Sequence, residues 1–186
     1  VSATGTDNVD KIAAAAHGVT VCNVTAYGTP SVAQHTMMLM LNLATRFEHY
    51  RTDVQAGDWS RSERFCLMGH QASELSGETL GVIGAGELGS AVADLARAFG
   101  MKVLIWDRTG QGEAGRIALE PLLEQVDFLS IHCLLTPQTQ GLIGASEIAR
   151  MKSGSFIINT ARGGIVDEAA LLKALDSGHL GGAGFD

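Results

Sequence analysis

Three glycines in the pattern Gly84-x-Gly86-x-x-Gly89 are the residues whose spacing most directly suggests a chemistry. They lie between an apolar run at 80–83, typical of a buried strand, and a segment whose apolar side chains have helical spacing. In such a unit the first glycine permits a tight turn, the second lets a pyrophosphate approach the backbone, and the third lets helix and strand pack closely. The N–H groups at the start of the helix would then face the phosphates.

An aspartate at a suitable distance strengthens this interpretation. A second apolar run ends in Asp107, 18 residues after Gly89, and an acidic side chain about 20 residues beyond the turn can bind the hydroxyls of an adenosine ribose. Because the chain has 23 glycines, the spacing alone is weak, and a structural turn followed by a solvated aspartate is the alternative. The agreement of strand, turn, helix, strand and aspartate in this order favours dinucleotide binding.

Arg162 is the candidate catalytic residue. It follows an apolar run in the sequence Asn159-Thr-Ala-Arg-Gly-Gly164, and the two glycines after it allow a tight turn that would aim the guanidinium into a crevice. A planar, always charged guanidinium suits a carboxylate with an adjacent keto oxygen. The ordinary alternative is a solvated or salt-bridged arginine.

The histidines and cysteines give weaker evidence of a catalytic or binding role. His132 and Cys133 follow an apolar run, but a satisfied histidine at a strand end and a small apolar filler are their simplest interpretations. Four further histidines have no identifiable partner and are expected to be structural: His35, His49, His70 and His179.

The elements that must position these residues alternate from residue 76 onward. Strands are predicted at 79–83, 102–106, 127–131, 155–159 and 181–185, and helices at 87–99, 120–125, 145–150 and 168–177, with a glycine-rich loop at 110–115. Alternating strands and helices predict an α/β fold of the Rossmann type, a doubly wound parallel sheet covered on both faces. Ligands of such sheets bind at the carboxyl ends of the strands, where the candidate residues lie.

The first 75 residues follow a different pattern. They are predicted to form a helix at 9–17 capped by the Asp7–Asn8 region, a strand at 19–24, a long helix from 31 to about 56, and a surface loop at 57–75. Apolar side chains spread widely around the long helix, which suggests contact with a second domain or subunit. A plain core helix fits the pattern equally well.

Composition excludes several classes of function. The chain has 186 residues, a hydrophobic fraction of 46% and a net charge of −7, which argue for a folded domain and against nucleic acid or an anionic membrane as partner. The three cysteines match no metal spacing and predict reduced thiols in a cytoplasmic protein. The chain begins with Val1 and stops at an apparent strand end, so we expect an internal piece of a longer protein.

The sequence resembles the D-isomer-specific 2-hydroxyacid dehydrogenases along essentially its whole length, with the glycerate dehydrogenase (hydroxypyruvate reductase) branch most similar. The motifs that carry the resemblance are Thr4-Gly-Thr-Asp-Asn8, Tyr27-Gly-Thr-Pro-Ser-Val-Ala-Gln-His35, Gly57-Asp-Trp59, Gly81-Val-Ile-Gly-Ala-Gly-Glu-Leu-Gly89, Phe99-Gly-Met101, His132-Cys133, Asn159-Thr-Ala-Arg-Gly-Gly-Ile-Val-Asp-Glu168 and Gly178-His-Leu-Gly-Gly-Ala-Gly-Phe-Asp186.

The resemblance implies a role for each matching residue. Glu87 and Leu88 would offer backbone N–H groups to the pyrophosphate, Asp107 would bind the adenosine ribose, and Cys133 would line the adenine or ribose pocket. Thr4 would face cofactor and substrate from the other domain.

The same resemblance assigns the nicotinamide half and the substrate. Thr160 and Ala161 would contact the nicotinamide, Asp186 would hold its carboxamide, and Arg162 would bind the carboxylate of a 2-oxo acid and polarise its carbonyl. No metal is expected.

Two positions depart from the family pattern. Leu134 replaces the usual proline, which would alter that loop. Asp107 is followed by Arg108 and Thr109, and residues of this kind bind a 2′-phosphate in some family members. Because the Asp107 carboxylate would repel this phosphate, NAD is favoured over NADP.

The implied organisation has three parts. Residues 1–28 would be the remnant of a flavodoxin-like catalytic domain, 29–75 a linking helix and loop, and 76–186 the NAD-binding domain. The helix at 31–56 would form a homodimer interface. The family's catalytic histidine and glutamate would lie beyond Asp186, so the chain alone is expected to bind NAD with little catalysis.

The implied function is hydride transfer between NAD(H) and a small 2-hydroxy or 2-oxo acid of the glycerate, hydroxypyruvate or glyoxylate type. A binding module, an NAD(H)-sensing corepressor on the same scaffold, is the alternative from another class. A related hydride enzyme acting on formate or phosphite is a further enzymatic alternative.

Overall fold

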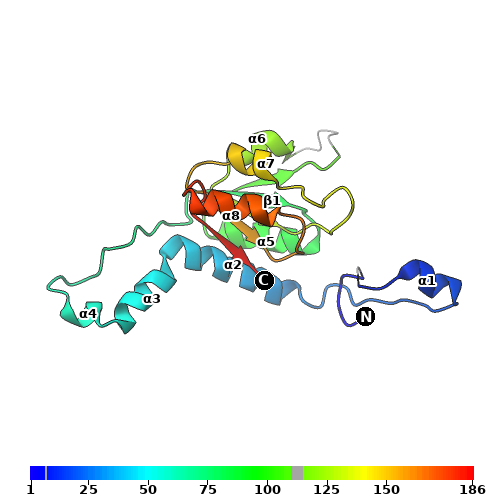
Figure 1. The fold of residues 1–186 in the computed structure, drawn as a ribbon, viewed down its shortest axis with the longest axis horizontal. Coiled ribbons are helices and arrows are strands. Elements are labelled where there is room, and N and C mark those ends of the chain that lie inside the picture. Colours follow the sequence, from blue (N-terminus) through cyan, green and yellow to red (C-terminus); the bar gives the residue numbers. More distant parts are fainter. Residues whose placement is uncertain (7, 110–114) are drawn as a thin grey trace.

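A six-stranded parallel sheet forms the centre of the computed structural model, which describes residues 1–6, 8–109 and 115–186 (Figure 1). The strand order is β3-β2-β1-β4-β5-β6. The strands are β1 (Thr79–Ile83), β2 (Lys102–Trp106), β3 (Arg116–Ile117), β4 (Phe128–Ile131), β5 (Phe156–Asn159) and β6 (Gly182–Phe185). This is the order of a doubly wound dinucleotide-binding sheet, so the predicted Rossmann-type fold is confirmed. The two-residue strand β3 was not predicted.

Helices cover both faces of the sheet. One face carries α2 (Thr29–Thr45) and α5 (Glu87–Ala98), and the other carries α6 (Leu119–Leu123), α7 (Ala145–Arg150) and α8 (Glu168–Asp176). The buried strands β4 and β5 are apolar in nearly every position because both of their faces are covered. The four helices predicted from residue 76 onward are confirmed, with ends that differ by at most two residues.

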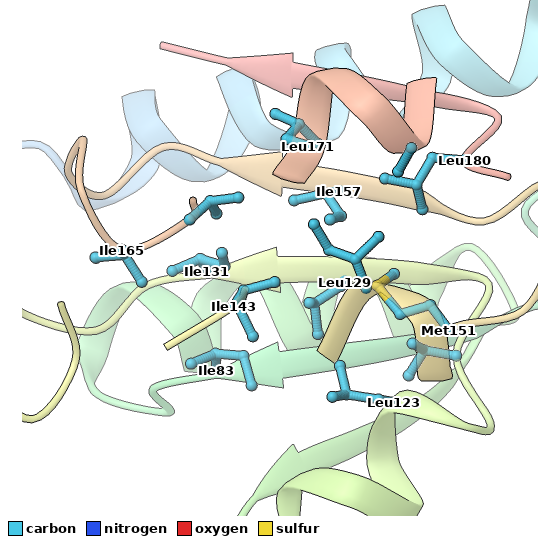
Figure 2. Packing of buried hydrophobic residues seen from close by; sticks show 14 of the residues in the cluster. Ile83, Leu123, Leu129, Ile131, Ile143, Met151, Ile157, Ile165, Leu171 and Leu180 are labelled. Carbon is cyan, nitrogen blue, oxygen red and sulfur yellow. The ribbon is translucent and has the colours of Figure 1, made fainter. Parts of the chain in front are cut away.

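Two hydrophobic clusters follow from the alternation of side chains along each strand. In β1, Leu80 and Val82 face α2 and α5, whereas Ile83 faces α6, α7 and α8. Figure 2 shows the second cluster, in which Leu129 and Ile157 from adjacent strands pack among the helix residues. The sheet is therefore held rigidly from both sides, and its carboxyl edge is a fixed platform for side chains.

The helix predicted from 31 to about 56 is in fact two helices. Helix α2 ends at Thr45, Arg46 adopts a left-handed conformation with φ of 54°, and α3 (Phe47–Gln55) continues in a new direction. The Arg46 guanidinium donates to the Gly181 carbonyl oxygen (2.9 Å) and lies over the Phe156 ring. These tertiary contacts favour the unusual backbone conformation, which the helical spacing of the sequence does not reveal.

The strand predicted at 19–24 is wrong. These residues have irregular backbone and no neighbouring strand, and Val19 is 59% exposed. Isolated hydrogen bonds tie them to the N-terminal loop, from Val24 N–H to Ala3 O and from the Val1 amino group to Cys22 O. Alternating β-branched residues specify a strand only where a sheet edge is available to pair with.

The first helix, α1 (Lys11–Ala16), is shorter than predicted and is capped by Asp10, whose carboxylate accepts from the Ile12 and Ala13 N–H groups. The predicted cap at Asp7–Asn8 is therefore wrong in position, and Asp7 itself lies outside the described residues. So does most of the predicted glycine-rich loop, 110–114.

The predicted surface loop at 57–75 contains one short helix, α4 (Asp58–Arg61), and is otherwise irregular. Helices α3 and α4 extend away from the sheet at the end of the molecule opposite α1 (Figure 1). Among the described residues, neither of these helices nor segment 1–28 contributes a buried side chain. In the part of the chain that the structure describes, no helix has the length and apolar character to cross a membrane.

Candidate functional site

The three glycines form a turn between β1 and α5, and each meets a different surrounding. Gly84 has φ of +95°, and a Cβ there would lie 2.8 Å from the Cys133 backbone nitrogen. A Cβ on Gly89 would overlap the Gly84 carbonyl oxygen. A Cβ on Gly86 would meet no heavy atom within 4 Å. The turn is thus closed around the first and third glycines and open at the second, as a bound pyrophosphate requires.

The start of α5 presents free backbone donors beside this opening. Gly86 is the N-cap, and the first helical bond runs from Ser90 N–H to Gly86 O (2.9 Å). The N–H groups of Glu87, Leu88 and Gly89 precede that bond and have no partner within the helix. The Glu87 carboxylate accepts from Thr29 Oγ1 at the start of α2 (2.8 Å). The donor groups and the helix dipole together favour an anion at this point.

The strand order reverses between β1 and β4, and the crevice of a doubly wound sheet opens at that point. The Gly84 turn and the His132–Cys133 segment come from these two neighbouring strands and touch each other. The structure therefore brings the predicted glycine turn and Cys133 together at the carboxyl edge of the sheet.

Burial keeps the side chains of the β4 segment neutral. The His132 Nε2 atom lies 2.8 Å from Ser130 Oγ, and its buried Nδ1 has no hydrogen-bond partner among the described residues. Burial lowers the pKa of His132 from 6.5 to about 4 and raises the pKa of the half-buried Cys133 thiol. Ser130 has no place in the predictions from sequence, although its two-residue spacing from His132 puts both on one face of β4.

Asp107 lies where it was predicted, at the carboxyl end of β2, next to β1. It is 6% exposed. Its Oδ1 accepts from the Thr109 N–H (3.0 Å) and Thr109 Oγ1 (2.7 Å), which hold the carboxylate in one orientation. A carboxylate fixed in this way is prepared to accept hydrogen bonds from vicinal hydroxyls.

The Arg162 loop is organised by a buried asparagine at the end of β5. Asn159, 2% exposed, accepts from the Ala161 N–H (3.0 Å) and donates to Arg162 O (2.8 Å). Arg162 has an exposed side chain, and its Nη1 donates to Ala161 O (2.8 Å). Asn159 appeared in the sequence motif without a role, and the structure shows that its side chain shapes the turn.

Helix α2 contacts both remaining edge residues. Thr36 Oγ1 lies 3.0 Å from Thr160 Oγ1, and His35 Nε2 lies 3.7 Å from Asp186 Oδ1. Thr4 differs from the other candidates because it lies in the N-terminal segment, where its hydroxyl donates to Val24 O, and not on the sheet.

The four histidines whose partners the sequence did not identify each have one in the structure. Besides His35, His70 lies 2.8 Å from an Asp53 carboxylate oxygen and stacks on His49, and His179 Nε2 lies 2.9 Å from Ile148 O. Within residues 1–6, 8–109 and 115–186, no cluster of three His, Cys, Asp or Glu side chains could hold a metal ion.

A parallel sheet with this strand order, a three-glycine turn at its switch point and an acidic residue after the next strand defines a dinucleotide-binding domain. Comparison with known proteins identifies the family. Residues 37–186 match the family model described as "D-isomer specific 2-hydroxyacid dehydrogenase, NAD binding domain". The chain belongs to this family, and its cofactor is NAD.

Relatives of known name agree with this assignment. The chain is 47% identical to the glycerate dehydrogenase of Methylorubrum extorquens, over 100% of this chain and 59% of the relative. The structure of the TT0316 protein from Thermus thermophilus superposes with a TM-score of 0.90 and 37% identity, covering 99% of this chain and 58% of that one. The D-lactate dehydrogenase of Aquifex aeolicus, solved with NAD and lactic acid, has a TM-score of 0.87 and 36% identity, covering 99% and 55%. The chain thus spans less than two thirds of the length of these relatives.

Proposed function

We propose that this chain is the cofactor-binding part of an oxidoreductase that transfers a hydride between NAD(H) and a small 2-hydroxy or 2-oxo acid, of the glycerate, hydroxypyruvate or glyoxylate type. One observation carries the proposal: the phosphate-binding turn and the Arg162 loop end strands β1 and β5, which flank β4, at one edge of the sheet. A cofactor lying along that edge would have an arginine available for an acidic substrate.

The adenosine half of NAD would be held by backbone and carboxylate. The N–H groups of Glu87 and Leu88 would bind the pyrophosphate over the open side of Gly86, and Asp107 would accept hydrogen bonds from the ribose hydroxyls. Cys133 would line the pocket as a neutral thiol, because burial raises its pKa. A second negative charge beside buried Asp107 would be repelled, which supports NAD over NADP.

The nicotinamide half and the substrate would lie toward β5 and β6. Thr160 and Ala161 would contact the nicotinamide ring, and Asp186 would bind its carboxamide. Arg162 would pair with the substrate carboxylate and polarise the adjacent carbonyl, since its planar fork matches both oxygens. The bound NAD supplies the hydride carrier, while the protein orients the reactants and excludes water.

We also propose the division of the chain predicted from its sequence. Residues 1–28, which include Thr4 and have no buried side chain among those described, would belong to a second domain. Residues 29–75 would link it to the NAD-binding domain at 76–186. Helix α2 supports this role because it packs on β5 and β6 and carries the first core residue, Ala33.

A homodimer is part of the proposal. A groove of about 1080 Å³ runs between α2 and α5, and its lining includes Met37, Met38, Leu41, Leu95 and Phe99. An apolar groove of this size on two long helices is suited to a second copy of the chain.

The test is binding and turnover measured together. NADH should bind the chain with micromolar or tighter affinity in a fluorescence titration. The full-length gene product should oxidise NADH with at least one of hydroxypyruvate, glyoxylate and pyruvate. Tight NADH binding without turnover of any 2-oxo acid would contradict the enzyme assignment and would favour an NAD(H)-sensing protein.

A further inference from the structure

Two threonine hydroxyls meet where α2 crosses the end of β5. Thr36 is completely buried in α2, and its Oγ1 lies 2.8 Å from the Val32 carbonyl oxygen and 3.0 Å from Thr160 Oγ1. Thr160 directly follows β5 and is only partly buried. It stands at the edge of the sheet where the nicotinamide half of the cofactor is proposed to lie.

The direction of both hydrogen bonds follows from counting protons. A carbonyl oxygen can only accept, and two oxygens 2.8 Å apart repel each other unless a hydrogen lies between them, so Thr36 donates to Val32. A hydroxyl has a single proton. The proton between the two threonines must therefore come from Thr160, which donates to Thr36.

This arrangement leaves Thr160 with lone pairs only. Its proton is directed into the protein toward α2, so the hydroxyl can accept a hydrogen bond from a ligand but cannot donate one. Thr160 would then favour a ligand group with an N–H and disfavour a group that offers only a carbonyl oxygen.

We propose that Thr36 is a positioning residue that fixes the Thr160 hydroxyl as a hydrogen-bond acceptor for the carboxamide N–H of the nicotinamide ring. The inference rests on the proposed function, because it requires the nicotinamide to lie beside β5. It adds a residue on α2, outside the strand ends, to the groups that determine which cofactor binds.

Helix α2 offers a matched control. Thr45 makes the same kind of bond to the carbonyl four residues earlier, Leu41 O (2.7 Å), but it is exposed and lies nine residues further along the chain. Thr45→Val removes an equivalent hydroxyl from the same helix without altering Thr160. Thr36→Ser keeps the hydroxyl at the buried position and should behave as the wild type.

The experiment compares two reduced cofactors by fluorescence titration of the chain. One is NADH and the other is its 3-acetylpyridine analogue, in which an acetyl group replaces the carboxamide and provides a carbonyl oxygen without an N–H. The wild type should bind NADH more tightly. In Thr36→Val the Thr160 hydroxyl is no longer fixed as an acceptor, so NADH should bind about threefold to tenfold more weakly. The freed Thr160 proton can be donated to the acetyl oxygen, so the analogue should bind equally or more tightly.

The selectivity ratio separates the possible outcomes. A Thr36→Val protein that keeps the wild-type ratio of the two dissociation constants, whether or not both cofactors bind more weakly, would overturn the inference. If this variant does not fold, Thr160→Val removes the acceptor directly, and an unchanged ratio in that variant would overturn it as well. A wild-type chain that binds neither cofactor would instead overturn the proposed function, and the inference with it.

Discussion

At the scale of single residues, the candidate site depends on side chains that hold others in place. Asn159 bonds to the backbone on both sides of the Arg162 turn, Thr109 orients Asp107, and Ser130 binds His132. Asn159 and Ser130 are buried, so their rotamers are limited by packing as well as by the hydrogen bond, whereas Thr109 is exposed and is linked to Asp107 by its hydrogen bonds.

Arg162 provides the most direct test of substrate binding. In the full-length enzyme, Arg162→Lys should reduce kcat/KM for a 2-oxo acid by roughly 10- to 100-fold, because lysine keeps the charge but lacks the planar fork. The dissociation constant for NADH should change less than twofold. Equal losses in NADH affinity and in kcat/KM would instead indicate that the substitution disturbs the loop around Asn159.

His132 predicts a pH dependence of stability. Its pKa falls from 6.5 when exposed to about 4 in the fold, so the unfolded chain binds a proton more readily between these values. The free energy of unfolding should therefore decrease as the pH falls below 6.5, by about 2 kcal/mol between pH 7 and pH 5 from this residue alone. Urea denaturation at several pH values should show that His132→Gln lacks this part of the decrease. If the free energy of unfolding fell equally with pH in wild type and variant, the lowered pKa of His132 would be contradicted.

At the scale of elements, short backbone segments set the geometry of the site. The turn between β1 and α5 is tight at Gly84 and Gly89, where Cβ atoms would collide with backbone, and open at Gly86. The junction of α2 and α3 depends on the left-handed Arg46, which is bound to the Gly181 carbonyl. These contacts join segments far apart in the sequence and hold the helices at fixed positions on the sheet.

Two glycine substitutions should separate binding from folding. Gly86 has an ordinary φ of −73°, so Gly86→Ala should leave the free energy of unfolding within about 0.5 kcal/mol of wild type, while NADH binds at least roughly tenfold more weakly. Its Cβ would occupy the open space at which the pyrophosphate is proposed to approach.

Gly89→Ala should lower both the stability of the fold and the affinity for NADH. Its Cβ would overlap the Gly84 carbonyl oxygen, so α5 must move away from β1, at a cost of about 1–3 kcal/mol in stability as well as a loss of NADH binding. Chemical denaturation and NADH titration of the two variants check the pair. Normal NADH affinity in Gly86→Ala would place the phosphates elsewhere.

At the scale of the whole molecule, an apolar groove lies open between α2 and α5. Leu95 and Phe99 on α5 are 39% and 45% exposed, and Met38 on α2 is 43% exposed. Residues of this kind gathered in one groove are typical of an interface between subunits. The protruding pair α3 and α4 lies next to it in the chain and exposes Phe47 and Trp59.

Sedimentation velocity tests this interface. We expect the wild-type chain to be dimeric at micromolar concentration and Leu95→Glu to shift it toward monomer, because a charge would be buried without a partner. Leu172→Glu is the matched control, since Leu172 is 58% exposed on α8, across the sheet from the groove. A wild type that remains monomeric would contradict the proposed homodimer.

Much of the sheet could be predicted from the sequence because its information is local. Runs such as 80–83 and 128–131 are apolar over the length of a strand. The glycine turn, with Asp107 after the next strand, indicates both the fold and the class of ligand. The same locality placed Arg162 and Cys133 at strand ends, since every parallel strand ends at the same edge.

Local pattern alone predicted the strands and helices that follow one another from residue 76, except the two-residue β3, and the ligand class of the glycine turn. Only the tertiary structure decided that 19–24 is not a strand, that α2 ends at Thr45 before the left-handed Arg46, and that the Thr36 and Thr160 hydroxyls meet. Each outcome depends on a part of the chain that is distant in sequence. Residues 19–24 have no neighbouring strand to pair with, Arg46 binds the Gly181 carbonyl oxygen, and Thr36 contacts a hydroxyl 124 residues away. Hydrogen bonds and packing between such distant segments leave no periodic signal in the sequence, because they arise only once the chain has folded.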